Sequence, residues 1–94
     1  MTSEKHGDKV RLQILNAGLE IWPDITPSSV ARAAGMKSHA AVLYHFPRAE
    51  LKDAIADHAV AVGDARVIVQ LIARGHKATK KLTHAEKQKF FNSL

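Results

Sequence analysis

The sequence predicts an all-α fold, a small helical domain of about five to six helices. Apolar residues recur at helical spacing along most of the chain, and no stretch alternates apolar and polar residues as a strand would. Proline, glycine and capping residues divide the chain into helix-length segments. The chain has 94 residues, so we expect one compact domain overall, with a head at residues 1–58 and a second helical segment with a basic end at residues 59–94.

The first two helices are separated by a proline. The first carries its apolar face between Val10 and Trp22, and Pro23 ends it because a proline ring does not fit inside a helix. The second begins at Thr26-Pro27, because threonine is a favoured N-cap and proline suits the first helical position. We expect this second helix to run to about residue 34.

A short turn follows the second helix. Gly35 stands where a helix end needs a left-handed residue, which glycine adopts without strain. Ser38 can cap the next helix only three residues later. Two helices joined by so short a glycine-containing turn are typical of a helix-turn-helix.

The third helix is predicted from about His39 to Phe46, and it has two different faces. One face is expected to fill the core with Val42, Leu43 and Phe46. Small side chains make the opposite face low and open, which would let a helix approach base edges in the major groove of DNA. The other interpretation is an exposed, slightly apolar helix face. The opposite face consists of Lys37, Ala40, Ala41 and Tyr44.

The second half of the chain carries three more helical segments. A fourth helix starts at Pro47 with an apolar stripe of Leu51, Ile55, Ala59 and Val62. The segment VIVQLIA (67–73) is apolar nearly all round, so we expect it to be buried on several sides, in its own chain or against another copy. A capping box, Thr83 to Glu86, opens the last short helix. The expected homodimer interface consists of Val62, Val67, Ile68, Val69, Leu71 and Ile72.

The net charge of +5 is concentrated near the C-terminus. Residues 1–73 hold eight basic and eight acidic groups, whereas residues 74–94 hold six basic groups and one acid. A basic end favours a polyanionic partner. A solvated segment that only improves solubility is the alternative. If the segment binds DNA, Lys77, Lys80 and Lys81 are the expected phosphate contacts.

The stretch TPSSVARAAGMKSHAAVLYHFPRAEL resembles the DNA-binding head of TetR-type regulators, and ILNAGLEIW extends the resemblance to about residues 10–55. The shared pattern is a capped helix, an alanine-glycine turn, a helix ending in Tyr-His-Phe, and the acid-leucine pair Glu50-Leu51. The resemblance implies a protein that binds double-stranded DNA. Among the residues it implies, Thr26 and Ser28 would contact phosphate, Lys37, Ser38, His39, Ala40 and Ala41 would face bases, and Tyr44 and His45 would contact the DNA backbone.

The chain also departs from this family pattern. The link between the first two helices is shorter, the stretch from Gly35 to Phe46 is one residue longer, and Ala49 stands where the family often has lysine. TetR-type regulators carry a long helical ligand-binding domain after the head. Only 39 residues follow Ile55 here, so we expect no pocket for a small-molecule inducer.

Catalytic and metal-binding roles are not expected. The chain has no cysteine, which excludes disulfides and thiolate metal sites. No glycine-rich phosphate loop occurs, the acids are scattered, and the histidines lack the i, i+4 spacing of a ligand pair. We therefore predict no enzyme activity, no cofactor and no metal. No apolar run could span a bilayer and no signal-peptide core occurs, so we expect a cytoplasmic protein without membrane contact.

Two classes of function remain. The first is a small sequence-specific DNA-binding protein, a transcriptional regulator that binds as a dimer through the helix-turn-helix. The second is a helical protein-interaction module, and a DNA-packaging or replication accessory protein lies between the two. The Thr-Pro start, the glycine turn and the Tyr-His-Phe end favour DNA, whereas the zero net charge of residues 1–73 counts against it.

Overall fold

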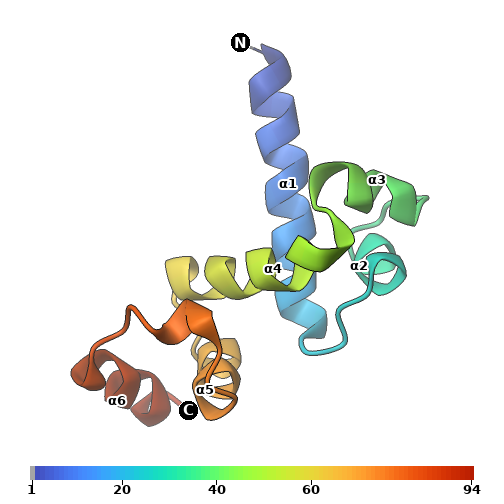
Figure 1. Cartoon of the computed structure of the whole chain (residues 1–94). Helices are drawn as coiled ribbons and strands as arrows, with labels where there is room; N and C mark the ends of the chain where they lie inside the picture. The colour runs from blue at the N-terminus through green and yellow to red at the C-terminus, as the bar shows by residue number, and fades with distance from the viewer. Residues whose placement is uncertain (1) are drawn as a thin grey trace. The chain divides into compact units, whose positions relative to one another are not determined.

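The computed structural model describes the backbone of residues 2–94 and the side chains of residues 7–94. This part of the chain contains helices and no strand, which confirms the all-α fold class (Figure 1). No helix within it is long and apolar enough to cross a lipid bilayer. The elements are α1 (Thr2–Ile21), α2 (Pro27–Ala33), α3 (His39–His45), α4 (Arg48–Val62), α5 (Ala65–Ala73), the 3₁₀ helix η1 (Lys77–Thr79) and α6 (His84–Asn92).

The chain forms two compact units, Met1–Ile55 and Ala56–Leu94, and the division falls inside α4. The first unit packs α1, α2, α3 and the start of α4 around an aliphatic core. Gly18 marks a close approach inside this core, because a methyl group there would collide with the side chain of Ile55. Its fully buried large side chains are Ile14, Val30, Val42, Leu51 and Ile55.

The predicted helix starts are confirmed by local hydrogen bonds. Thr26, Ser38 and Thr83 are the N-caps of α2, α3 and α6, and Pro27 is the first residue of α2. The capping box at α6 is complete. Thr83 N–H donates to Glu86 Oε1 at 3.0 Å, and Glu86 N–H donates to Thr83 Oγ1 at 3.1 Å. Hydrogen bonding of the carboxylate to the Thr83 backbone N–H, and then to the Thr83 side chain, lowers the pKa of the Glu86 carboxyl below its ordinary value.

The expected core contacts of α3 and α4 are corrected at two positions, Leu43 and Val62. Leu43 is only half-buried. Phe46 is buried as expected and, as the C-cap of α3, has an extended backbone. Val62 continues the predicted stripe of α4, yet 57% of its surface is exposed. Val62 is the last residue of α4, and the chain turns away directly after it at Gly63, where φ is +73°.

Within the single chain α5 has one buried face, so only burial of VIVQLIA against another copy stays a prediction. Val67, Ile68 and Leu71 lie three and four positions apart and share that face, with no more than 1% of their surface exposed. Val69 and Ile72 are half-buried. The three buried residues cannot contact a second copy in the folded chain. Only Val62, Val69 and Ile72 of the expected dimer interface keep accessible surface.

The basic end of the chain is folded. His76 caps η1, a helix that the sequence did not predict, because Ala78 N–H donates to its Nδ1 at 2.9 Å. The Thr79 hydroxyl donates to the carbonyl of His76 at 2.8 Å and is buried with Ala78. In α6 no residue is fully buried, and Phe91 is 44% exposed.

Candidate nucleic-acid interface

The turn between α2 and α3 has the hydrogen bonds of a Schellman motif. Gly35 N–H donates to the carbonyl of Arg32 at 3.2 Å, and Met36 N–H donates to that of Ala31 at 2.8 Å. This pattern requires a left-handed residue, and Gly35 has φ +73°. Ser38 then begins α3 by accepting from Ala40 N–H at 3.1 Å. The local sequence thus builds the helix-turn-helix with its own backbone groups.

Two side chains of α1 contact the C-terminal ends of α2 and α3. The Gln13 amide donates to the carbonyl of Ala34, the C-cap of α2. The Arg11 guanidinium donates to the carbonyl of His45 at 3.2 Å and lies 4.5 Å from the centroid of the Phe46 ring. Carbonyl groups at the end of a helix lack partners inside the helix, so Arg11 satisfies one of them. These contacts fix α3 against α1.

The outer face of α3 is exposed and carries small side chains. Ala40 is exposed and Ala41 is half-buried, while Val42 on the inner face is fully buried. Tyr44 is 84% exposed, and its ring meets that of His45 edge-on at 5.1 Å between centroids. The outer face of α3 therefore carries two alanines, followed toward its C-terminal end by the aromatic pair Tyr44 and His45.

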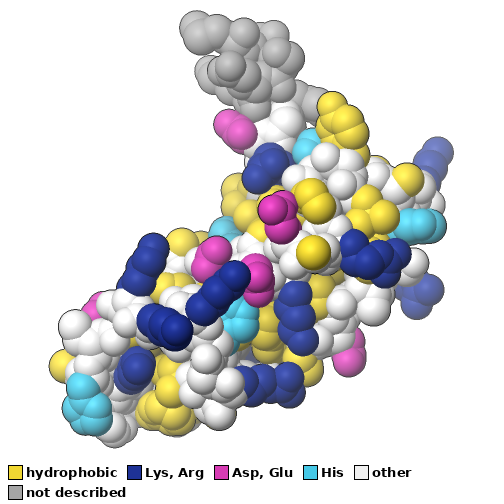
Figure 2. All heavy atoms as spheres, in the orientation of Figure 1, with side chains coloured by type: hydrophobic (Ala, Val, Ile, Leu, Met, Phe, Trp, Pro, Cys, Tyr) yellow, Lys and Arg dark blue, Asp and Glu magenta, His cyan; other side chains and the backbone are white. Residues whose placement is uncertain are grey.

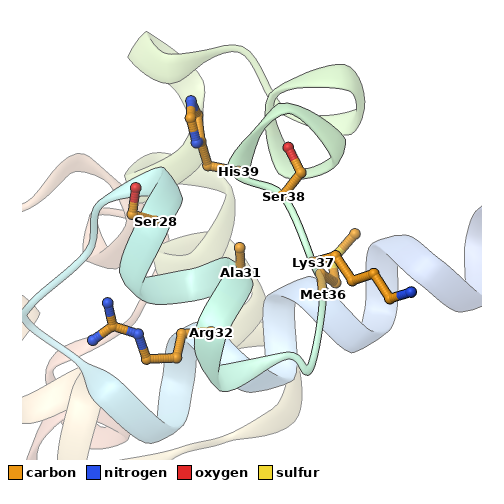
Figure 3. A pocket seen from close by; sticks show the side chains of 7 residues that line it. All are labelled: Ser28, Ala31, Arg32, Met36, Lys37, Ser38 and His39. Atoms are coloured by element: carbon orange, nitrogen blue, oxygen red, sulfur yellow. The ribbon is translucent and has the colours of Figure 1, made fainter.

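A shallow hollow of about 340 Å³ lies between α2, the turn and the start of α3. Figure 3 shows the side chains of Ser28, Ser38 and His39 along its rim. Arg32 and Lys37 extend away from each other on opposite sides of the hollow (Figure 3). The structure thus brings four residues expected at a DNA contact to one place, namely Ser28, Lys37, Ser38 and His39.

Arg32 is exposed and lines this hollow, although the sequence pattern did not predict a contact there. The zero net charge of residues 1–73 did not reveal the cations near Arg32, because acids outside the helix-turn-helix cancel them in the sum. Residues 25–49 contain no acid, three cations and two histidines. Dark blue and cyan side chains gather over the surface formed by α2 and α3 (Figure 2). The helix-turn-helix is therefore locally basic in a first unit that also contains acids.

Thr26 is the N-cap of α2, and the phosphate contact that the family resemblance implies for it stays a prediction. Its Oγ1 accepts from Ser29 N–H at 3.0 Å and donates to Ser29 Oγ at 2.9 Å. The hydroxyl proton is thus already used inside the cap. A phosphate oxygen would have to displace Ser29 as its acceptor.

The remaining candidate residues lie in the second unit. Lys77, Lys80 and Lys81 are exposed on η1 and the turn that follows it. Across the residues whose side chains are described, no three His, Asp or Glu groups converge as metal ligands would. Comparison of the chain with protein-family models, with curated proteins and with solved structures finds no match.

Proposed function

We propose that this chain is a sequence-specific DNA-binding protein, a small transcriptional regulator that reads the major groove with α3 and binds as a dimer. The observation that carries the proposal is the exposed outer face of α3, set in a helix-turn-helix that contains no acidic residue between Asp24 and Glu50. The resemblance of this segment to TetR-type heads supports the same function. The proposal includes no catalytic step, no cofactor and no inducer, and it places the protein in the cytoplasm.

The small side chains on α3 favour close contact with bases. A helix must enter the major groove for its side chains to reach base edges, and a bulky residue would hold its backbone away. Ala40 and Ala41 allow this approach and can contact the methyl group of thymine. Tyr44, being exposed, can donate its hydroxyl to a phosphate beside the groove.

The cations beside α3 would supply affinity that does not depend on base sequence. Arg32 and Lys37 flank the hollow from opposite sides, so each can meet a phosphate while α3 lies in the groove. Arg11 would act indirectly, because both of its contacts are made to the end of α3.

The test begins with selection of duplexes from a random library by the full chain, followed by affinity measurements at two salt concentrations. Tyr44→Ala should weaken binding to the selected duplex. Ala40→Glu should reduce both affinity and discrimination by about 1–3 kcal/mol for each interaction with a base that the substitution removes. Ala85→Glu is the matched control, because Ala85 is an exposed alanine on α6. If folded Ala40→Glu and Ala85→Glu bind the selected duplex equally well, α3 does not read DNA.

A further inference from the structure

A second hollow, of about 560 Å³, lies in the second unit and is lined by no residue of the helix-turn-helix. One wall is the last two turns of α4, and the other is η1 with the turn after it. The residues that line it are Asp57, Val60, Ala61, Lys77, Ala78 and Lys81.

Three of the lining residues are apolar, and we call them the floor of the hollow: Val60, Ala61 and Ala78. Val60 and Ala61 lie three and four positions after Asp57, so these residues share one face of α4. Ala78 of η1 is buried, Val60 is half-buried and Ala61 is exposed. Small residues around a concave surface leave room for a bulky apolar side chain from a partner.

The charges around the floor have opposite signs. Lys77 and Lys81 lie four positions apart on one wall, and both are exposed. Asp57, also exposed, lies on the other wall. Residues 74–94 contain six cationic side chains and a single acid, so this segment attracts negatively charged groups.

We propose that this hollow binds an acidic peptide segment of a partner protein. A bulky apolar side chain of the peptide would occupy the floor, and its carboxylates would lie beside Lys77 and Lys81. Interfaces commonly combine a buried apolar anchor with charge complementarity at the rim. The proposal does not rest on the helix-turn-helix, because none of its residues lines this hollow.

Two other occupants fit the hollow less well. A DNA backbone would gain nothing from the apolar floor, and its phosphodiester groups have no N–H or O–H that could donate a hydrogen bond to Asp57. A peptide has backbone N–H groups that can donate hydrogen bonds to the Asp57 carboxylate. A second copy of this chain has only one acid, Glu86, within residues 74–94, so that segment cannot supply several carboxylates to the lysines. An acidic peptide suits the floor, the lysines and the aspartate together.

The test uses a display library of random 12-residue peptides selected on the full chain, with Ala61→Trp as the counter-selection target. The tryptophan would fill the hollow, and the exposed position of Ala61 leaves the core intact. The enriched peptides should combine Asp or Glu with a bulky apolar residue. By fluorescence anisotropy they should bind at least tenfold more weakly to Ala61→Trp and to Lys81→Glu than to the natural chain.

Two matched controls lie outside the hollow on α6. Ala85→Trp adds the same bulk at another exposed alanine, and Lys89→Glu makes the same charge change at another exposed lysine. Both should keep the affinity within twofold, and circular dichroism should show native helicity for all four variants. If Ala61→Trp fails to fold, the comparison of Lys81→Glu with Lys89→Glu still decides.

Three results would overturn the proposal. The selection could enrich no peptide over the counter-selection target, or enrich peptides without acidic residues. The hollow variants and their controls could bind the enriched peptides equally well. Finally, Lys81→Glu could weaken the binding of a 20-base-pair duplex and the binding of the peptides by the same factor, while Ala61→Trp leaves both affinities unchanged. That result would assign these lysines to DNA.

Discussion

Arg11 belongs to α1, yet both of its contacts are made at the end of α3. Its guanidinium donates to the His45 carbonyl at 3.2 Å and lies 4.5 Å from the centre of the Phe46 ring. Arg32, in contrast, is exposed beside the hollow between α2 and α3. Two arginines of one unit thus have different environments, one structural and one available to a ligand.

We expect the two arginines to separate stability from DNA binding. Arg11→Met should lower the free energy of unfolding by about 1–2 kcal/mol, because it removes a cation–π contact and a charged hydrogen bond. Arg32→Met should stay within about 0.5 kcal/mol of the natural chain, as exposed substitutions do, and should reduce the log–log salt slope of DNA binding by about one. Urea unfolding and salt titrations check both. Equal unfolding midpoints for the two variants would contradict the structural role of Arg11.

At the scale of elements, the connection of α2 to α3 depends on the backbone of one residue. Gly35 has φ +73°, and a β-carbon placed on it would meet no atom within 4 Å. A substitution there therefore tests backbone strain without steric collision. Gly7, inside α1, has equally open surroundings and no positive φ.

Alanine at these two glycines should have effects of opposite sign. Gly35→Ala should lower the free energy of unfolding by about 1–2 kcal/mol, because a left-handed conformation is strained for alanine. Gly7→Ala should raise it by up to about 1 kcal/mol, because alanine is the better helix former. Thermal unfolding followed by circular dichroism gives both values. A Gly35→Ala protein as stable as the natural chain would mean that the turn adopts another conformation.

The start of α6 should depend on pH through Glu86. Its pKa is lowered in the folded chain, so its contribution to stability is present above the ordinary pKa of 4.5 and is lost as the pH falls through the lower folded value. The carbon chemical shifts of α6 should therefore move toward coil values at pH below about 4.5. Glu86→Gln keeps an acceptor for Thr83 N–H and should abolish this dependence. An unchanged titration in Glu86→Gln would assign the effect to another acid.

At the scale of the whole molecule, a dimer needs an apolar surface that the single chain leaves uncovered. The buried face of α5 cannot provide it. Exposed apolar side chains of the second unit remain at Val62, Phe91 and Leu94. A pair of heads would contact two half-sites, which raises affinity for DNA.

Sedimentation at micromolar concentration should give twice the chain mass of 10.3 kDa. Val62→Glu should shift the protein toward the monomer and weaken DNA binding, because a charge at an apolar interface lacks a partner. Leu12→Glu is the matched control, since Leu12 is 48% exposed on α1. A natural chain that stays monomeric both alone and on DNA would exclude the dimer.

The sequence by itself determined the helical class, the helix starts and the turn. Thr26, Gly35, Ser38 and Thr83 act through hydrogen bonds or dihedral angles that involve residues at most a few positions away, so one local stretch contains the whole interaction. Most of the proposed α3 contact residues could be found for the same reason.

Burial and long-range contacts were decided by the tertiary structure alone. Val62 fits the apolar stripe of α4 in sequence, but it is exposed because the chain turns away after it. Arg11 meets the end of α3 across 34 positions of sequence, and no local pattern announces that pairing. The hollow beside Lys81 is lined by residues of both α4 and η1, and η1 is a helix that the sequence did not predict. Spacing indicates which residues share a face of a helix, whereas the packing of distant segments decides which parts of that face are covered.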